Sequence, residues 1–174
     1  MKIVVIGLGY IGLPTAAILA SSKMAINGSI NSIQVVGVDT NQHTVDTINQ
    51  GKIHIIEHDL DILVKKSVET GNLYATTKPE KANVFLIAVP TPFQRNHKPN
   101  LSYIKSAVKK IAPYLERGNM VILESTSPVG TTEKIIDWMQ QERNDLSFPK
   151  YGVDDISVDI AVAHCPERVL PGNI

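Results

Sequence analysis

The chain contains a single cysteine, Cys165, among its 174 residues. One cysteine excludes an internal disulfide and a metal cluster built from several thiolates, and it favours a reducing, cytoplasmic compartment. No metal site is predicted, because the histidines show no ligand spacing with one another or with carboxylates. The histidines concerned are His54, His58, His97 and His164.

An excess of charge of one sign is also lacking, since 17 Lys and Arg residues balance 17 Asp and Glu residues. A balanced chain has no overall field that would attract nucleic acid or an anionic membrane, so neither partner is expected. There is no internal repeat and no low-complexity tract. Hydrophobic residues (43%) and charged residues (20%) occur in ordinary globular proportions, and the length allows one domain with a substantial core.

What the chain does have is a glycine-rich N-terminus. Residues 3–6 form a short β-branched run, which is typical of a buried parallel strand. Gly7, Gly9 and Gly12 complete a G-x-G-x-x-G motif ahead of an apolar stretch suited to a helix. In a dinucleotide site Gly7 allows the tight turn, and Gly9 lets a pyrophosphate approach the backbone. Gly12 lets the helix pack against the sheet, and the helix N-terminus attracts the phosphates.

The same N-terminal segment has two competing interpretations. Residues 3–20 carry no charge and follow Lys2, as in a signal peptide cleaved near Ser21-Ser22 or in a membrane helix. Both interpretations require a continuous helix, which three glycines and Pro14 interrupt early. We therefore favour the dinucleotide site.

An acidic residue follows the second expected strand. Residues 33–38 form that strand, and Asp39 stands at its C-terminal end, where dinucleotide folds place the acid that binds the adenine-ribose hydroxyls. Asp39 follows Gly12 by 27 residues instead of about 20. A loop at residues 24–32, which contains an Asn-Gly pair, explains the excess as an insertion. An acid here disfavours a 2′-phosphate, so NAD is predicted over NADP.

Asp39 also has a purely structural interpretation. A helix is expected at residues 42–49, and its first turn needs a side-chain oxygen that accepts from a backbone N–H. Asp39 could supply that oxygen, but Thr40 or Asn41 could do so equally well. We therefore favour the ribose role for Asp39.

Two further strands end in polar turns. Residues 83–89 are a buried strand that runs into Pro90-Thr91-Pro92, where the prolines hold the Thr91 hydroxyl and backbone in one place. Residues 120–124 are another buried strand, and the hydroxyl-rich turn at residues 125–132 follows it. One Ser or Thr is expected as a helix cap, so the remaining hydroxyls indicate a second polar wall for a ligand.

Strands and helices alternate along the chain, which predicts an α/β fold with a Rossmann-type, doubly wound parallel sheet in a single domain. The ligand site is then expected at the carboxyl ends of the strands. The remaining elements predicted are helices at residues 12–23, 59–69, 101–116 and 133–141, strands at 72–76 and 158–163, and loops at 51–57, 93–100 and 143–157.

The residues by themselves indicate no reaction centre. Cys165 has His164 beside it, but adjacent residues of an extended segment point opposite ways, so the imidazole is badly placed to activate the thiol. We expect Cys165 to be a packing residue, since free cysteines are commonly buried. The chain also lacks a G-x-S-x-G elbow and a Walker lysine.

Five segments taken together resemble the N-terminal domain of the UDP-glucose/GDP-mannose 6-dehydrogenases. They occur in order along nearly the whole chain, which is far more specific than the glycine motif alone. UDP-glucose enzymes tend to carry Asn-Pro-Glu-Phe-Leu in the last segment, whereas Pro-Glu-Arg-Val-Leu-Pro-Gly is similar to the members that act on UDP-N-acetyl-D-mannosamine. The segments are Gly-Leu-Gly-Tyr-Ile-Gly-Leu-Pro (7–14), Val-Asp-Thr-Asn (38–41), Ile-Ala-Val-Pro-Thr-Pro (87–92), Glu-Ser-Thr-Ser-Pro-Val-Gly-Thr-Thr (124–132) and Cys-Pro-Glu-Arg-Val-Leu-Pro-Gly (165–172).

The resemblance implies a twofold, NAD-dependent oxidation in polysaccharide biosynthesis. The C6 alcohol of UDP-N-acetyl-D-mannosamine would become the carboxylate of UDP-N-acetyl-D-mannosaminuronate. Besides the glycines, the implied NAD contacts are Tyr10, Ile11, Asp39, Thr91 and Thr132. Thr126 and Glu167 are implied to position the water or the reacting oxygen, and Arg168 and Val169 to touch the nucleotide sugar.

The catalytic cysteine of that family lies in a Gly-Gly-His-Cys motif much further along, with a lysine and an asparagine on intervening helices. None of these is present here, and Cys165 is not that residue. We therefore expect residues 1–174 to be the NAD-binding domain of a longer, homodimeric dehydrogenase, without its central helix and C-terminal domain and inactive alone. The alternatives are a UDP-glucose or UDP-GlcNAc 6-dehydrogenase and a non-catalytic nucleotide-binding regulatory module.

Overall fold

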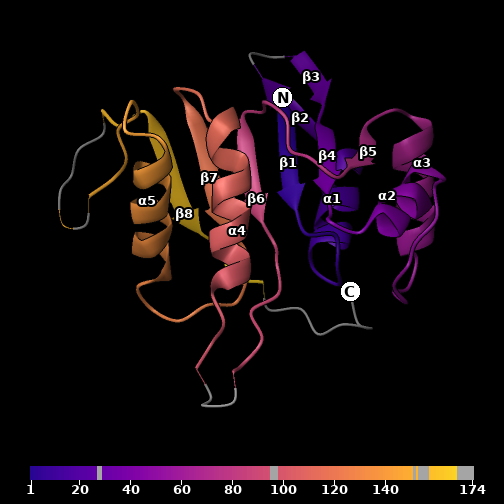
Figure 1. The fold of residues 1–174 in the computed structure, drawn as a ribbon. Helices are drawn as coiled ribbons and strands as arrows, with labels where there is room; N and C mark the ends of the chain where they lie inside the picture. Colours follow the sequence, from indigo (N-terminus) through magenta and orange to yellow (C-terminus); the bar gives the residue numbers. More distant parts are fainter. Residues whose placement is uncertain (27–28, 95–97, 151, 153–156, 168–174) are drawn as a thin grey trace.

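The main sheet has six parallel strands in the order β5-β4-β1-β6-β7-β8 (Figure 1). This computed structural model describes residues 1–26, 29–94, 98–150, 152 and 157–167. The chain starts at the centre of the sheet, runs outward to β5, returns to β6 beside β1 and then runs outward on the other side. The strands are β1 (Lys2–Ile6), β4 (Gln34–Val38), β5 (Leu73–Thr76), β6 (Val84–Ile87), β7 (Asn119–Leu123) and β8 (Ile160–His164). This order confirms the doubly wound parallel sheet.

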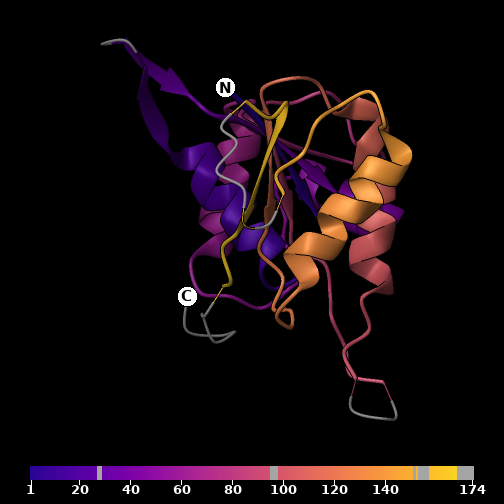
Figure 2. The same ribbon diagram turned by 90° about the vertical axis from the view of Figure 1, so that its left-hand side faces the viewer.

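Helices cover both faces of the sheet. α1 (Gly12–Ser21), α2 (Gln42–Asn49) and α3 (Leu60–Glu69) contribute to one hydrophobic core. α4 (Ser102–Ile111) and α5 (Thr131–Glu142) contribute to the other and lie across the sheet from α1 (Figure 2). Neighbouring strand residues alternate between the two cores, as Val4 and Val5 of β1 do.

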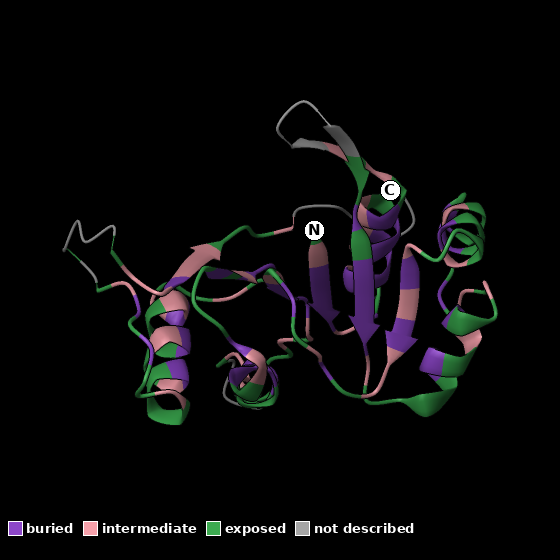
Figure 3. Ribbon diagram, turned by 90° about the horizontal axis from the view of Figure 1, so that it is seen from above, coloured by how far each residue is buried: buried purple, intermediate pink, exposed green. Residues whose placement is uncertain are grey.

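Burial on both faces explains the apolar strand sequences. Val4 and Val5 are both fully buried, and the central strands in Figure 3 are almost entirely in the buried colour. A strand that contacts helices on each side needs apolar residues at every position instead of at alternate ones. The continuous β-branched run of residues 3–6 is therefore a consequence of the central position of β1.

The segment predicted as a loop at residues 24–32 contains a hairpin instead. β2 (Lys23–Ile26) and β3 (Ser29–Ser32) pair antiparallel as a separate two-stranded sheet, which projects away from the main sheet (Figure 2). Asn-Gly between two extended segments is a strong hairpin signal. The second strand, Ser-Ile-Asn-Ser, is mostly polar and so obscured that signal, because its sequence is not typical of a buried strand.

The helix predicted at residues 101–116 is shorter than expected. α4 ends at Ile111, and a 3₁₀ turn, η1 (Ala112–Tyr114), follows it. Pro113 lies in that turn. A proline has no N–H to continue the α-helical ladder, so the sequence itself contained the signal that was overlooked.

The N-terminal segment is a strand followed by a helix, not one continuous helix. β1 is hydrogen-bonded between β4 and β6 at the centre of the sheet. Within the part of the chain that the structure describes, no helix is long and apolar enough to cross a membrane.

Candidate functional site: a dinucleotide cleft at the carboxyl edge of the sheet

The glycine turn between β1 and α1 is held tightly by the backbone around it. Gly7 has a φ of 93°, and its N–H donates to the carbonyl of Val38 (2.8 Å). A Cβ on Gly7 would lie 2.7 Å from the carbonyl oxygen of Ala88. A Cβ on Gly12 would lie 1.8 Å from the carbonyl oxygen of Gly7. The turn therefore requires glycine at both positions.

Gly9 is different, because open space lies beside it. A Cβ on Gly9 would meet no protein atom within 4 Å. The N-terminus of α1 has no side-chain cap and no acidic residue in its first turn. In this first turn the N–H groups of Leu13 and Thr15 donate to the carbonyls of Gly9 and Ile11, and Pro14 has no N–H. The partial positive charge of the helix end is what remains available to an anion. An open approach and an uncapped helix fit the pyrophosphate of NAD.

Asp39 lies next to the glycine turn, directly after β4. Its carboxylate accepts hydrogen bonds from the backbone N–H of Leu8 (Oδ2, 3.0 Å) and of Asn41 (Oδ1, 2.9 Å). The cap of α2 is Asn41, whose side chain accepts from the N–H of His43 (3.0 Å). Helix capping therefore does not account for Asp39. Each carboxylate oxygen has further lone pairs with which to accept from a ribose hydroxyl.

Two cavities share a wall formed by Val89 and Pro90, just after β6. The first has a volume of about 250 Å³ and lies between the glycine turn and α4; its walls include Gly7, Asp39, Tyr103 and Lys110. The second has a volume of about 210 Å³; its walls include Ile11, Thr91, Glu124, Ser125, Thr126 and Glu167. Both cavities lie at the carboxyl ends of the central strands, where the order of the sheet reverses between β1 and β6.

Hydrogen bonds join the two polar turns that form the second cavity. The hydroxyl of Thr91 donates to the backbone carbonyl of Thr126 (2.7 Å). The hydroxyl of Ser125 donates to the carbonyl of Val89 (2.8 Å). The Pro90-Thr91-Pro92 turn and the hydroxyl-rich turn after β7 are therefore held together, and part of the hydroxyl content serves this purpose.

Two carboxyl groups line the second cavity, and the sequence interpretation singled out only Glu167. Glu124, the residue after β7, is buried, and its Oε1 accepts from the hydroxyl of Thr15 on α1 (3.0 Å). The backbone N–H of Glu167 donates to the carbonyl of Glu124 (3.3 Å). Burial raises the pKa of Glu124, the charge of Glu167 raises it further, and the Thr15 hydrogen bond opposes both. A charged residue at the end of an apolar strand was the overlooked signal.

The whole chain, residues 1–174, matches the UDP-glucose/GDP-mannose dehydrogenase family, NAD binding domain. The chain belongs to this family. It is 60% identical to a UDP-N-acetyl-D-mannosamine dehydrogenase of Campylobacter jejuni, over 99% of this chain and 40% of that protein. It is 59% identical to an NDP-N-acetyl-D-galactosaminuronic acid dehydrogenase of Ralstonia nicotianae, over 98% of this chain and 38% of that protein.

A solved structure has the same fold. The UDP-N-acetyl-mannosamine dehydrogenase of Staphylococcus aureus superimposes with a TM-score of 0.82 at 36% identity, over 99% of this chain and 38% of that one. The chain thus spans about two fifths of the length of the relatives it matches. Over that length it corresponds to the NAD-binding domain of the dehydrogenase family.

Ten of the twelve predicted site residues lie in the part of the chain that the structure describes, and six of these ten line the two cavities. The ones that line a cavity are Gly7, Ile11, Asp39, Thr91, Thr126 and Glu167. The other four described residues line neither cavity: Gly9, Tyr10 (47% exposed) and Gly12 lie in the glycine turn, and Thr132 is the second residue of α5. Arg168 and Val169, predicted to contact the nucleotide sugar, lie outside the described residues.

Cys165 is exposed, so its prediction as a packing residue is wrong. Its backbone N–H donates to the carbonyl of Leu123 (2.9 Å), which extends the pairing of β8 with β7 by one step. β8 is the edge strand of the sheet. Because an edge strand has a neighbour on one side only, a residue just beyond its end finds little to pack against.

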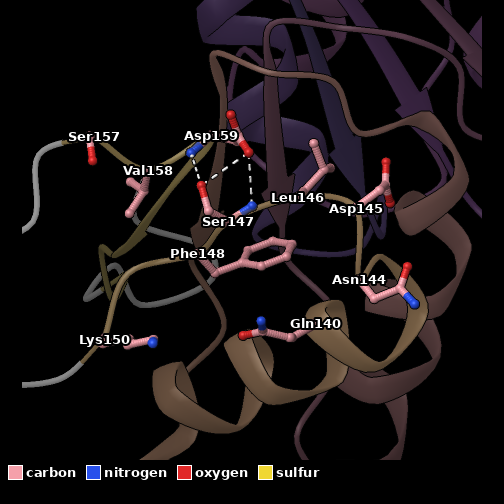
Figure 4. Close-up of a pocket in the computed structure, with 10 residues that line it drawn as sticks. All are labelled: Gln140, Asn144, Asp145, Leu146, Ser147, Phe148, Lys150, Ser157, Val158 and Asp159. Atoms are coloured by element: carbon pink, nitrogen blue, oxygen red, sulfur yellow. Dashed lines mark hydrogen bonds between the residues drawn. The ribbon is translucent and has the colours of Figure 1, made fainter.

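A larger cavity lies elsewhere, between the C-terminal end of α5 and the segments that flank it (Figure 4). It has a volume of about 590 Å³ and lies near the amino end of β8, away from the carboxyl edge of the sheet. Asp159 accepts there from the backbone N–H and the hydroxyl of Ser147 (2.9 and 3.0 Å). None of the predicted site residues lines it, and we regard the paired carboxyl-edge cavities as the site.

Glu124→Gln is expected to make the free energy of unfolding less dependent on pH. Because the pKa of Glu124 is raised in the folded chain, the folded state holds its proton more tightly than the unfolded state does. Stability then falls as the pH rises from the usual glutamate range through the raised pKa. The variant avoids that loss, so it gains stability over the wild type at neutral pH only.

Urea unfolding at acid and neutral pH measures this difference. Glu133→Gln removes an exposed carboxyl from the first turn of α5 and serves as the matched control. A stability difference between Glu124→Gln and the wild type that is equal at both pH values would contradict the burial effect.

Proposed function

We propose that this chain is the NAD-binding part of a nucleotide-sugar 6-dehydrogenase that oxidises UDP-N-acetyl-D-mannosamine to UDP-N-acetyl-D-mannosaminuronate with two NAD. The observation that carries the proposal is the pair of cavities on a common wall. Asp39 lines one and Thr126 and Glu167 line the other, so a dinucleotide can extend from a ribose-binding carboxylate to a polar reaction end.

In this proposal NAD supplies a hydride acceptor, and the residues of the chain bind and orient. The open backbone at Gly9 and the N-terminus of α1 hold the pyrophosphate, and Asp39 accepts from the ribose hydroxyls. Thr126 and Glu167 position the water or the reacting oxygen at the other end. Thr91 donates to the Thr126 carbonyl and so fixes a wall of the second cavity, which would hold the reactive end of NAD.

The substrate is proposed from the relatives and from the Pro-Glu-Arg-Val-Leu-Pro-Gly segment. A relative at 60% identity is named for UDP-N-acetyl-D-mannosamine. One at 59% identity is named as an NDP-N-acetyl-D-galactosaminuronic acid dehydrogenase, so an N-acetylgalactosamine derivative is the second candidate. Arg168 and Val169 are proposed to contact the nucleotide sugar.

Substrate and activity are tested together by NADH formation. A longer protein that contains this chain and the Gly-Gly-His-Cys segment is expected to form two NADH per UDP-N-acetyl-D-mannosamine. It should prefer that sugar over UDP-glucose, UDP-GlcNAc and the N-acetylgalactosamine derivative. Residues 1–174 alone are expected to bind NAD and to form no NADH. NADH formation by residues 1–174 alone would refute the proposal that the catalytic cysteine lies in the Gly-Gly-His-Cys segment, outside these residues.

The proposal extends to the setting of the enzyme. We place it in the cytoplasm, in polysaccharide biosynthesis, as a homodimer with no nucleic-acid or membrane partner. The single cysteine and the balanced charge support the compartment and the partners. Light scattering on the longer protein measures the mass of the dimer.

Asp39→Ala is expected to weaken NAD binding by about 1.5–3 kcal/mol, the contribution of a hydrogen bond to a charged group. This corresponds to roughly a tenfold to hundredfold rise in Kd, measured by titration calorimetry. Asp46→Ala removes the same charge from an exposed position on α2 and is the control. Unchanged affinity in a folded Asp39→Ala chain would refute the ribose assignment.

A further inference from the structure

Glu124 is almost fully buried, and one of its carboxyl oxygens lacks a hydrogen-bond partner among the described residues. The residue is only 8% exposed at the end of β7. Its Oε1 accepts from the Thr15 hydroxyl (3.0 Å), whereas Oε2 is buried and has no hydrogen-bond partner among the described residues. An ionised carboxylate with an unpartnered buried oxygen is costly, because the charge loses its hydration without compensation.

The groups packed around Glu124 include one other charge. α1 contributes the neutral hydroxyl of Thr15, and the segment after β6 contributes uncharged residues to the shared cavity. Glu167 follows β8, lines the same cavity of about 210 Å³ and donates its backbone N–H to the Glu124 carbonyl. Of the ionisable groups described, Glu167 is the one whose charge acts on Glu124, and it raises the pKa of Glu124.

Two carboxyl groups in one small cavity cannot both ionise without repulsion, so one of them retains a proton over a wider pH range. Glu124 is the more buried of the two, since Glu167 is partly exposed. The contacts also fit a neutral Glu124, because Oε1 can accept from Thr15 as the carbonyl oxygen while Oε2 carries the proton.

We propose that Glu124 is a positioning residue that forms a carboxyl pair with Glu167 and holds the one proton that the pair retains. Glu167 lines the same cavity, at the end of the site where the proposed function has it position the water or the reacting oxygen. The inference deepens the proposed function and rests on it for that role. The pairing itself is a property of the chain without NAD.

Carbon-13 NMR of the glutamate side-chain carboxyls, on the 174-residue chain without NAD, tests the pair. Glu124 is expected to titrate at a higher pH than the exposed glutamates. Glu167→Gln should lower the pKa of Glu124 by removing the repulsion, and Thr15→Val should raise it by removing a hydrogen bond to the charged form. Glu133→Gln, on the exposed face of α5, should leave Glu124 unchanged.

Glu124→Gln decides where the proton resides. Glutamine is a neutral isostere of the protonated acid, so the variant should lose the titration step that lies above those of the exposed glutamates. A high titration step that persists in Glu124→Gln would mean that another carboxyl holds the proton, and this would overturn the proposal. An unmoved Glu124 in Glu167→Gln would overturn it as well.

The outcome is separate from that of the proposed function, because no step of the titration involves NAD. A chain that binds NAD through Asp39 but shows independent carboxyls would retain its function and lose the pair. A chain with coupled carboxyls that fails to bind NAD would retain the pair and lose the function. Amide spectra of each variant show whether it is folded before the titration is interpreted.

Discussion

Gly12→Ala is expected to destabilise the chain by about 3 kcal/mol or more, at or beyond the upper end of what overpacking costs. The added Cβ would lie 1.8 Å from the carbonyl oxygen of Gly7 and 3.0 Å from its carbonyl carbon. Neither atom belongs to a flexible side chain. Gly7 cannot easily move away, because its N–H donates to the Val38 carbonyl and the Ala88 carbonyl oxygen occupies the space where its Cβ would be.

Such a loss is a large fraction of the roughly 5–15 kcal/mol that stabilises a typical domain. Urea unfolding followed by circular dichroism measures it. Gly9→Ala is the matched control, because it adds the same methyl group three residues earlier where no protein atom lies within 4 Å. Equal stability of the two variants would mean that the turn can shift to accommodate a side chain at residue 12.

Gly9→Val is expected to retain the fold, unlike Gly12→Ala, and to lose NAD binding. A Cβ at Gly9 meets no protein atom within 4 Å, so we expect the protein to accommodate the valine. The same side chain would occupy the path of the pyrophosphate and separate it from the N–H groups of α1. Loss of two hydrogen bonds to a charged group costs about 3 kcal/mol or more, which is at least about a hundredfold in Kd.

Titration calorimetry with NAD, on a chain whose circular dichroism is unchanged, measures this effect. Gly9→Ala should fall between the wild type and Gly9→Val, because its methyl group intrudes less. Parallel losses of stability and affinity in Gly9→Val would show that Gly9 is a structural glycine like Gly7 and Gly12. The three glycines of one motif are thus separable by experiment.

Several features of the site could be predicted from the sequence because they depend on local pattern. The β-branched run before Gly7 identified β1, and the apolar strands placed Asp39, Thr91 and Thr126 at strand ends. In a parallel sheet these ends lie at one edge, so the cleft followed from the order of the elements. The assignment of individual residues to NAD or to the sugar stays a prediction.

Other features required the tertiary structure. Glu124 is separated from Thr15 by 109 residues, and no local pattern indicates that their side chains meet. The exposure of Cys165 depends on β8 being the edge strand, which is a property of the whole sheet. From the sequence, any of three residues could cap α2. The hydrogen bond from the N–H of His43 to the side chain of Asn41 shows that Asn41 is the cap.

The sequence by itself determined the family, the doubly wound parallel sheet and the place of the cleft, because these depend on periodicity, turn residues and motifs that are contiguous in the chain. Only the tertiary structure decided which glycine has free space and which carboxyl is buried. The reason is physical: steric clash and desolvation depend on atoms from several elements, and those atoms meet only when the sheet is assembled.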